Sequence, residues 1–202
     1  MLNIFARASI SRWTHPLGAA LVRLGLTPNM VTIIGTVAGV ASALWFFPRG
    51  ELFVGTVVVT VFLLFDVLDG AMARAGGKSS TFGGVLDASC DRIADGALFG
   101  SLVWWALVVA EDRVLGFGLL ICLVGAQVTS YVKARAEANG LSADGGLAER
   151  AERFVLVLVG TGLHGLGLPY VLDIAVWVLA VLSALTIVQR LRAADQAGAG
   201  SS

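Results

Sequence analysis

The chain alternates long apolar runs with short polar interruptions. Six such runs dominate its 202 residues, near positions 30–47, 52–72, 83–110, 114–131, 154–166 and 170–188. A run of about 20 apolar residues is long enough to cross the hydrocarbon core of a bilayer as a helix. Because lipid offers no hydrogen-bond partners, the backbone of each crossing must satisfy its own polar groups, as a helix does. The sequence therefore predicts an all-α integral membrane protein with six transmembrane helices.

Composition excludes several other classes of protein. Hydrophobic residues make up 57% of the chain and charged residues only 14%, whereas a soluble domain carries about 25% charged residues. Basic and acidic residues balance at 14 each, so the composition gives no sign of nucleic-acid binding. The two cysteines, Cys90 and Cys122, lie in apolar runs and form no disulfide or zinc-binding pattern.

The chain divides into three segments. Residues 1–28 scatter arginines among apolar residues and predict an amphipathic helix that lies in the membrane interface. Residues 29–192 contain the six predicted crossings and form the main domain. Residues 193–202 are polar and small, and we expect them to be a disordered tail.

The basic residues predict the orientation. With both termini in the cytoplasm, the outer loops contain only Arg49 and Arg113 of the 14 basic residues. Lys and Arg in short loops are held on the cytoplasmic side. We therefore expect a multi-pass protein of the cell (inner) membrane, with segments 73–82 and 132–153 in the cytoplasm.

Five aspartates lie within two predicted crossings. They are Asp66, Asp69, Asp87, Asp91 and Asp95. A charged residue at the centre of a transmembrane helix costs at least about 2.5 kcal/mol on insertion scales, so this group needs compensating cations or metal. We therefore interpret the cluster as a functional site.

The spacing of four of these aspartates favours a metal site. Asp66 and Asp69 lie three residues apart, and Asp87 and Asp91 lie four apart, so each pair shares a helical face. The short connection 73–82 is expected to bring the two faces together. Oxygen ligands favour Mg²⁺ or Mn²⁺, and four carboxylates suit two such ions that clamp a diphosphate. Arginine-paired acids in a helix interface, or a proton relay, are the alternatives.

Eight positions between Asp66 and Asp91 resemble the signature of the CDP-alcohol phosphatidyltransferases. These are integral membrane enzymes that make phospholipids from CDP-linked precursors. The resemblance lies in the pattern Asp66-x2-Asp69-Gly70-x2-Ala73-Arg74-x8-Gly83-x3-Asp87-x3-Asp91. The predicted crossings and the Leu-Thr-Pro-Asn segment at 26–29 match the family as well.

The resemblance implies a role for each motif position. Asp66 and Asp87 would bridge two divalent metals, Mg²⁺ or Mn²⁺. Asp69 would complete the first metal site, and Asp91 would contact the second and act as general base on the acceptor hydroxyl. The donor would be CDP-diacylglycerol, and its nucleotide would contact Asn29, Thr32, Gly70, Arg74 and Ser80.

Asn29 and Asp95 each have a second interpretation. Asn29 stands where a helix N-cap is expected, which needs no ligand. Asp95 continues the i, i+4 series from Asp91 and would support the metal ligands. It would equally serve as the partner of Arg92 or of a cation on another helix.

The acceptor is predicted from a basic stretch after the fourth crossing. The run Ser-Tyr-Val-Lys-Ala-Arg-Ala-Glu-Ala-Asn-Gly at 130–140 resembles the actinobacterial phosphatidylinositol phosphate synthases, a branch of the same family. This resemblance implies myo-inositol 1-phosphate as acceptor, with its phosphate bound by Lys133, Arg135 and Arg153. Arg190 is a weaker candidate. Topology alone also fills cytoplasmic loops with basic residues, which is the alternative explanation.

Other functions remain open at this stage. Glycerol 3-phosphate is the second choice of acceptor, because it carries the same phosphate group on a smaller alcohol. A polyprenyl-diphosphate transferase would need two separated Asp-rich motifs, and the chain has one. A cation or proton transporter would use the aspartates as a pathway. The family resemblance also implies a homodimer.

Overall fold

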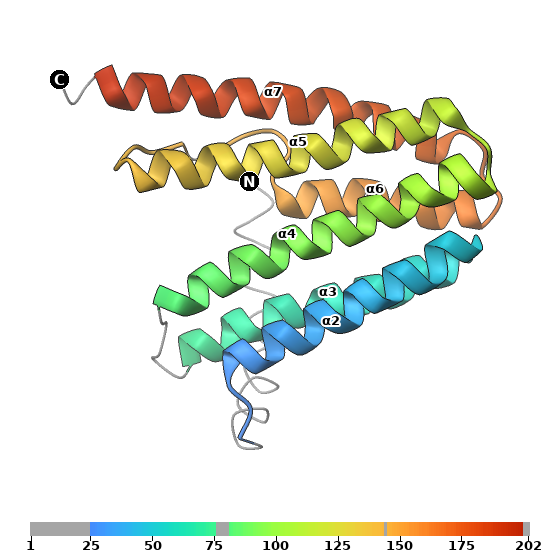
Figure 1. Ribbon diagram of the computed structural model, residues 1–202, viewed down its shortest axis with the longest axis horizontal. Helices are drawn as coiled ribbons and strands as arrows, with labels where there is room; N and C mark the ends of the chain where they lie inside the picture. The colour runs from blue at the N-terminus through green and yellow to red at the C-terminus, as the bar shows by residue number, and fades with distance from the viewer. Residues whose placement is uncertain (1–24, 76–80, 144, 200–202) are drawn as a thin grey trace. The chain divides into compact units, whose positions relative to one another are not determined.

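A computed structural model describes residues 25–75, 81–143 and 145–199, apart from the side chains of residues 65–75. Within these ranges every regular element is a helix, which confirms the predicted all-α class (Figure 1). The elements are α2 (Pro28–Phe46), η1 (Phe47–Arg49), α3 (Leu52–Ala75), α4 (Thr81–Trp104), η2 (Trp105–Val109), α5 (Arg113–Ala138), α6 (Arg150–Gly165) and α7 (Val171–Ala199).

Local sequence signals explain where several helices begin. The Thr27 hydroxyl accepts a hydrogen bond from the Met30 N–H at 3.3 Å, and Pro28 occupies the first helical position of α2. Asp112 caps α5 in the same way, because its carboxylate accepts from the Leu115 N–H at 2.9 Å. The preceding η2 is a π-helical turn in which the Ala110 N–H donates to the Trp105 carbonyl, five residues back.

One compact unit comprises Met1–Ser42 and Val58–Ala94. Its described part contains most of α2 and α3 and the first half of α4. A Cβ atom added to Gly39 on α2 would lie 3.5 Å from the Phe62 Cβ on α3, so the two helices are in van der Waals contact there.

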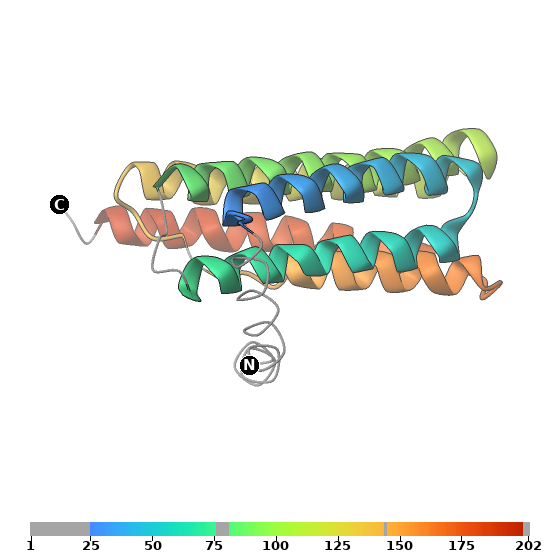
Figure 2. The same cartoon turned by 90° about the horizontal axis from the view of Figure 1, so that it is seen from below.

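The second compact unit comprises Ala43–Val57 and Asp95–Ser202. Within it α7 packs against both α5 and α6, and the two views agree on this arrangement (Figures 1 and 2). The α5–α7 contact depends on glycine, because an added Cβ at Gly118 would lie 2.8 Å from Val176 Cγ1, and one at Gly125 would lie 2.9 Å from Ser183 Cβ. Cys122, between these glycines on α5, is buried and donates to the Val176 carbonyl at 3.3 Å.

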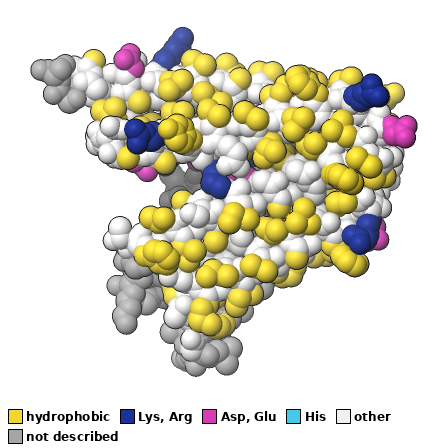
Figure 3. Space-filling model, viewed as in Figure 1, with side chains coloured by type: hydrophobic (Ala, Val, Ile, Leu, Met, Phe, Trp, Pro, Cys, Tyr) yellow, Lys and Arg dark blue, Asp and Glu magenta, His cyan; other side chains and the backbone are white. Residues whose placement is uncertain are grey.

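The surface suits a lipid environment. Many large apolar side chains are exposed, and they dominate the face seen in Figure 3. Four helical segments are long and apolar enough to cross a membrane, namely Pro28–Arg49, Thr81–Val109, Arg113–Ala138 and Val171–Ala199. The structure therefore describes a membrane protein with at least four candidate spans in its described part. The short α6 and the described apolar part of α3, Leu52–Leu64, fall below that length.

The two ends of the chain compare differently with expectation. The predicted interfacial helix at 1–28 lies mostly outside the described residues, and residues 25–27 precede the start of α2. The prediction of a disordered tail from residue 193 is wrong as far as Ala199, because α7 continues to that residue. Polar composition was misleading here, since Ala and Gln are good helix formers even without apolar neighbours.

Candidate active site

The motif aspartates lie on α3 and α4. Asp87 is exposed on α4, and the Asp91 side chain is 19% exposed with its carboxylate 3.9 Å from Arg92 Nη2. Their spacing of four residues on a continuous helix places both on one face. Asp66 and Asp69 lie in α3, but their side chains are outside the described set.

The predicted metal site is only partly visible in the described residues. Among the side chains that the structure describes, no three Asp, Glu, His or Cys residues are grouped as metal ligands. Two of the four predicted ligands, Asp66 and Asp69, fall outside that set. The donor chemistry still fits the expected ion, because carboxylate oxygens are the ligands that hard divalent cations prefer. The two-metal assignment stays a prediction.

The structure describes two of the five candidate nucleotide contacts in full, Asn29 and Thr32. Asn29 lies inside the first turn of α2, and Thr27 caps that helix, so the alternative interpretation of Asn29 as the N-cap is wrong. Thr32 is buried, and its hydroxyl donates to the Pro28 carbonyl at 3.1 Å. Gly70 and Arg74 lie in the part of α3 without described side chains, and Ser80 is outside the described residues.

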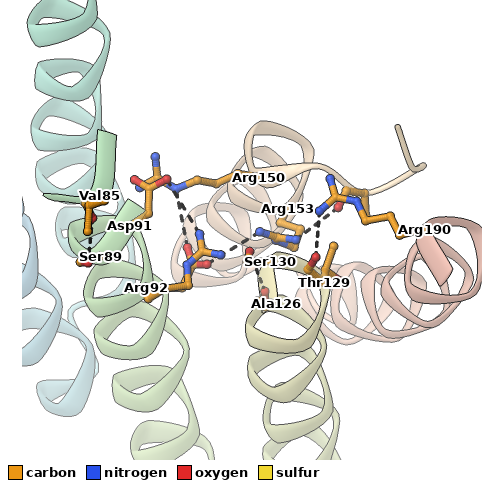
Figure 4. A network of polar contacts seen from close by, with 12 residues as sticks. Val85, Ser89, Asp91, Arg92, Ala126, Thr129, Ser130, Arg150, Arg153 and Arg190 are labelled. Carbon is orange, nitrogen blue, oxygen red and sulfur yellow. Dashed lines mark hydrogen bonds and ion pairs between the residues drawn. The ribbon is translucent and has the colours of Figure 1, made fainter. Parts of the chain in front are cut away.

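Asp95 forms the centre of a buried ionic cluster. It is 1% exposed, and its carboxylate oxygens lie 3.8 Å from Arg150 Nε and 3.7 Å from Arg153 Nη2, both on α6. This is one of the alternatives that the sequence left open, a cation on another helix. Arg150 and Arg153 lie close together in Figure 4.

Arg190 is the second buried arginine of this unit. It is 6% exposed, and its guanidinium joins two parts of the chain through backbone carbonyls. Nε donates to Gly145 O at 2.9 Å and Nη1 donates to Thr129 O at 2.8 Å (Figure 4). Arg190 therefore fixes the connection between α5 and α6 onto α5 and α7.

The two basic residues on α5 differ in direction. Lys133 follows Thr129 by four residues and shares its helical face, and its Nζ lies 3.7 Å from Glu137 Oε1. Arg135 is exposed and lies two residues after Lys133, about 200° around the helix. The structure thus separates two residues that the sequence had grouped in one clamp.

The most informative contacts that sequence reasoning left unresolved are those of Asp95. A carboxylate deep in an apolar helix needs a cationic partner, so the sequence contained a signal that such a partner exists. It contained no signal that pointed to Arg150 and Arg153, because these contacts depend on how the second half of α4 packs against α6.

Comparison with known proteins identifies the family. Residues 25–189 match the family model described as CDP-alcohol phosphatidyltransferase. The phosphatidylinositol phosphate synthase of Mycobacterium marinum is 55% identical over 189 residues, which cover 92% of this chain and 81% of that protein. The synthase of the same name from Mycobacterium tuberculosis is 53% identical and covers 94% of this chain and 89% of that protein.

Solved structures agree with the sequence relatives. The crystal structure of the Mycobacterium tuberculosis phosphatidylinositol phosphate synthase with CDP-DAG bound superposes with a TM-score of 0.87 at 53% identity, covering 91% of this chain and 94% of that one. A structure of that synthase in complex with manganese and citrate gives a TM-score of 0.86 at 53% identity and covers 90% and 88% of the two chains. The matched residues include the whole aspartate motif. The chain therefore belongs to the CDP-alcohol phosphatidyltransferases, a family of membrane transferases.

Proposed function

We propose that the protein transfers the phosphatidyl group of CDP-diacylglycerol to myo-inositol 1-phosphate and releases CMP. The observation that carries this proposal is the 53% identity, over 91% of the chain, to a phosphatidylinositol phosphate synthase whose crystal structure contains CDP-DAG. The presence of Asp87 and Asp91 on one face of α4 supports it, because the reaction needs carboxylates beside a diphosphate.

The donor site is assigned to the aspartates and the α2–α4 segments around them. Asp66, Asp69, Asp87 and Asp91 would hold two divalent ions, Mg²⁺ or Mn²⁺. When bound, such ions offset the negative charge of the diphosphate and of the leaving CMP. The nucleotide would contact Asn29, Thr32, Gly70, Arg74 and Ser80, of which Arg74 suits a phosphate because a guanidinium donates two parallel hydrogen bonds.

Asp91 is assigned as the general base. Its side chain is partly exposed, so an acceptor hydroxyl can approach its carboxylate. The hydroxyl gives its proton to Asp91, and its oxygen bonds to the β-phosphorus of the donor. The bond from that phosphorus to the oxygen of CMP then breaks, and CMP leaves with the electron pair.

The acceptor phosphate is assigned to the cations of the second unit. Lys133 and Arg153 are the strongest members, since one shares a face with Thr129 and the other is held at the start of α6. Arg135 is exposed on another side of α5 and is the weakest of the three predicted ligands, so we expect it to contribute little. Arg190 donates to two backbone carbonyls, which favours a supporting role.

The topology belongs to the same proposal. Six crossings with both termini in the cytoplasm agree with the basic residues of the loops, and they place the aspartates at the cytoplasmic face of the inner membrane. A homodimer is the expected assembly. Chemical cross-linking in native membranes tests it, and a monomer as the sole product would contradict it.

The deciding experiment measures CMP release by the purified protein with Mg²⁺ and CDP-diacylglycerol. Myo-inositol 1-phosphate, myo-inositol, glycerol 3-phosphate and serine are offered in turn. We expect myo-inositol 1-phosphate to give the highest kcat/KM, with glycerol 3-phosphate second. Preference for serine or for unphosphorylated inositol would overturn the proposed acceptor.

A further inference from the structure

The buried contact of Asp95 connects α4 to the first turn of α6. Asp95 lies among the buried residues Leu98, Phe99 and Leu102 on its helix and reaches both Arg150 and Arg153. All of these residues belong to the second compact unit. One buried carboxylate therefore contacts two guanidinium groups of the same helix.

Each arginine has a further fixed contact. The Arg150 guanidinium carbon lies 4.9 Å from the centre of the Phe154 ring, one turn along α6. Arg153 Nη1 donates to the Ala148 carbonyl at 3.3 Å, just before the helix begins. The two arginines are three residues apart and share a helical face. Together these contacts restrict both side chains to one side of the first turn of α6.

The charged side chains at the first turn of α6 differ in how far they are exposed. Asp95 supplies one negative charge to two guanidinium groups, and Asp95 and Arg153 are 1% and 3% exposed. The Arg150 side chain is 23% exposed, so it reaches the surface. Glu149, at the N-cap of α6, makes no side-chain capping bond, and Glu152 is exposed, where solvent weakens its field. The positive end of the helix dipole adds to the arginine charge.

We infer that Asp95 is a positioning residue that sets the preference of the enzyme for a phosphorylated acceptor. It does so by holding Arg150 and Arg153 where an acceptor phosphate meets them. This inference rests on the proposed function, because Arg153 is assigned there to the acceptor phosphate.

The physical effect of losing Asp95 differs between the two substrates. Without its carboxylate, Arg153 loses an ion pair while it stays buried, and a buried guanidinium that loses such a contact shifts toward water or its other partners. The contribution of the two arginines to phosphate binding then falls. An unphosphorylated acceptor has no phosphate to lose contact with, so its transfer rate changes less.

The test compares Asp95→Asn and Asp95→Glu with the wild-type protein and with Asp195→Asn. Asp195 is exposed on α7, so its replacement removes the same charge without touching the cluster. Full-length protein is assayed for CMP release with Mg²⁺ and CDP-diacylglycerol. The readout is the ratio of kcat/KM for myo-inositol 1-phosphate to kcat/KM for myo-inositol, together with the KM for CDP-diacylglycerol and the melting temperature.

We expect Asp95→Asn to lower this ratio by about tenfold or more, since a charge-assisted contact to phosphate is lost. Asp95→Glu should lower it by less, because it keeps the charge and moves it by one methylene. The ratio of Asp195→Asn should equal that of the wild type. The KM for CDP-diacylglycerol should stay within about twofold in all variants that fold, given that their donor site is intact.

Different failures have different meanings. A high wild-type ratio that both Asp95 variants retain would overturn the role of Asp95 alone, even if their melting temperatures fall. If Asp95→Asn does not fold, Asp95→Glu decides the matter in the same way. A wild-type ratio near or below one would overturn the proposed acceptor, and the inference with it.

Discussion

Asp87 and Asp95 lie on α4 in different compact units, and only Asp87 is exposed. Asp91, between them, is 19% exposed, whereas Asp95 is 1% exposed and lies near two arginines. The three residues have the same chemistry and the same spacing of four. Exposure therefore distinguishes Asp87 and Asp91, which are proposed to bind metal, from Asp95, which contacts arginines of α6.

Two glycines differ in the space around them. A Cβ atom added to Gly84, near Asp87, would meet no described atom within 4 Å, whereas one added to Gly125 on α5 would lie 2.9 Å from Ser183 Cβ. Among the described residues, none therefore packs against Gly84, whereas α5 and α7 are closely packed at Gly125.

The largest effect is expected from Asp87→Asn. In the proposed site this exposed carboxylate binds the divalent ions, and we expect the fold to tolerate its loss. Turnover should fall by more than about 1,000-fold, because metal and diphosphate stabilisation are lost together. CMP release reports the loss, and an unchanged melting temperature reports an intact fold. Full activity with Mg²⁺ supplied would show that exposure does not mark a metal ligand here.

Asp91→Asn should separate binding from chemistry. A general base contributes typically about 100- to 10,000-fold to the rate, whereas much of the donor site survives its loss. We expect kcat to fall by about 100-fold or more while CDP-diacylglycerol still binds. Equilibrium binding of labelled donor and single-turnover CMP release check the two parts. If Asp91→Asn transfers at the wild-type rate, the general base is another residue, and exposure does not mark the catalytic aspartate.

Lys133→Gln tests the cations of the second unit, with Arg135→Gln as its matched control. Both changes remove one positive charge from α5, and only Lys133 shares the face of Thr129. A charge-assisted contact to phosphate is worth about 1.5–3 kcal/mol, so Lys133→Gln should raise the acceptor KM by about 10- to 100-fold. Arg135→Gln should change it by less than about threefold. Equal effects would mean that helix face does not select the clamp.

The smallest effects concern packing. Gly125→Ala should lower the free energy of unfolding by about 1–3 kcal/mol, because the new methyl group overlaps Ser183. Gly84→Ala, on the open face, should leave stability unchanged or raise it by up to about 1 kcal/mol through helix propensity. Thermal unfolding in the same detergent compares them. Equal destabilisation would contradict the difference in packing between Gly84 and Gly125.

Sequence periodicity predicted much of the fold, because a membrane chain has few choices of backbone structure. The apolar runs located the start of each helix to within four residues, and the acids identified the motif. Helix ends were harder to predict. Hydropathy marks where apolar surface stops, whereas α5 and α7 continue through polar residues as far as Ala138 and Ala199.

The site was predictable to the extent that its residues are local in sequence. The shared face of Asp87 and Asp91 follows from their spacing alone. Asp95 lies 55 positions from its partner Arg150, and Arg190 lies 61 positions from Thr129, so only the packing of the helices reveals these contacts. Arg153 and Arg135 carry equal charge in the sequence, yet one is buried and the other exposed.

The connection between α5 and α6 is hydrogen-bonded to α7 at two places. The Ala148 N–H donates to the Thr186 hydroxyl at 3.0 Å, across 38 residues of sequence, and Arg190 holds the Gly145 carbonyl. An amide in such a bond exchanges its hydrogen with solvent only when the bond opens. The exchange rate of the Ala148 amide therefore reports how often this connection detaches from α7, independently of the exchange of the α7 backbone itself.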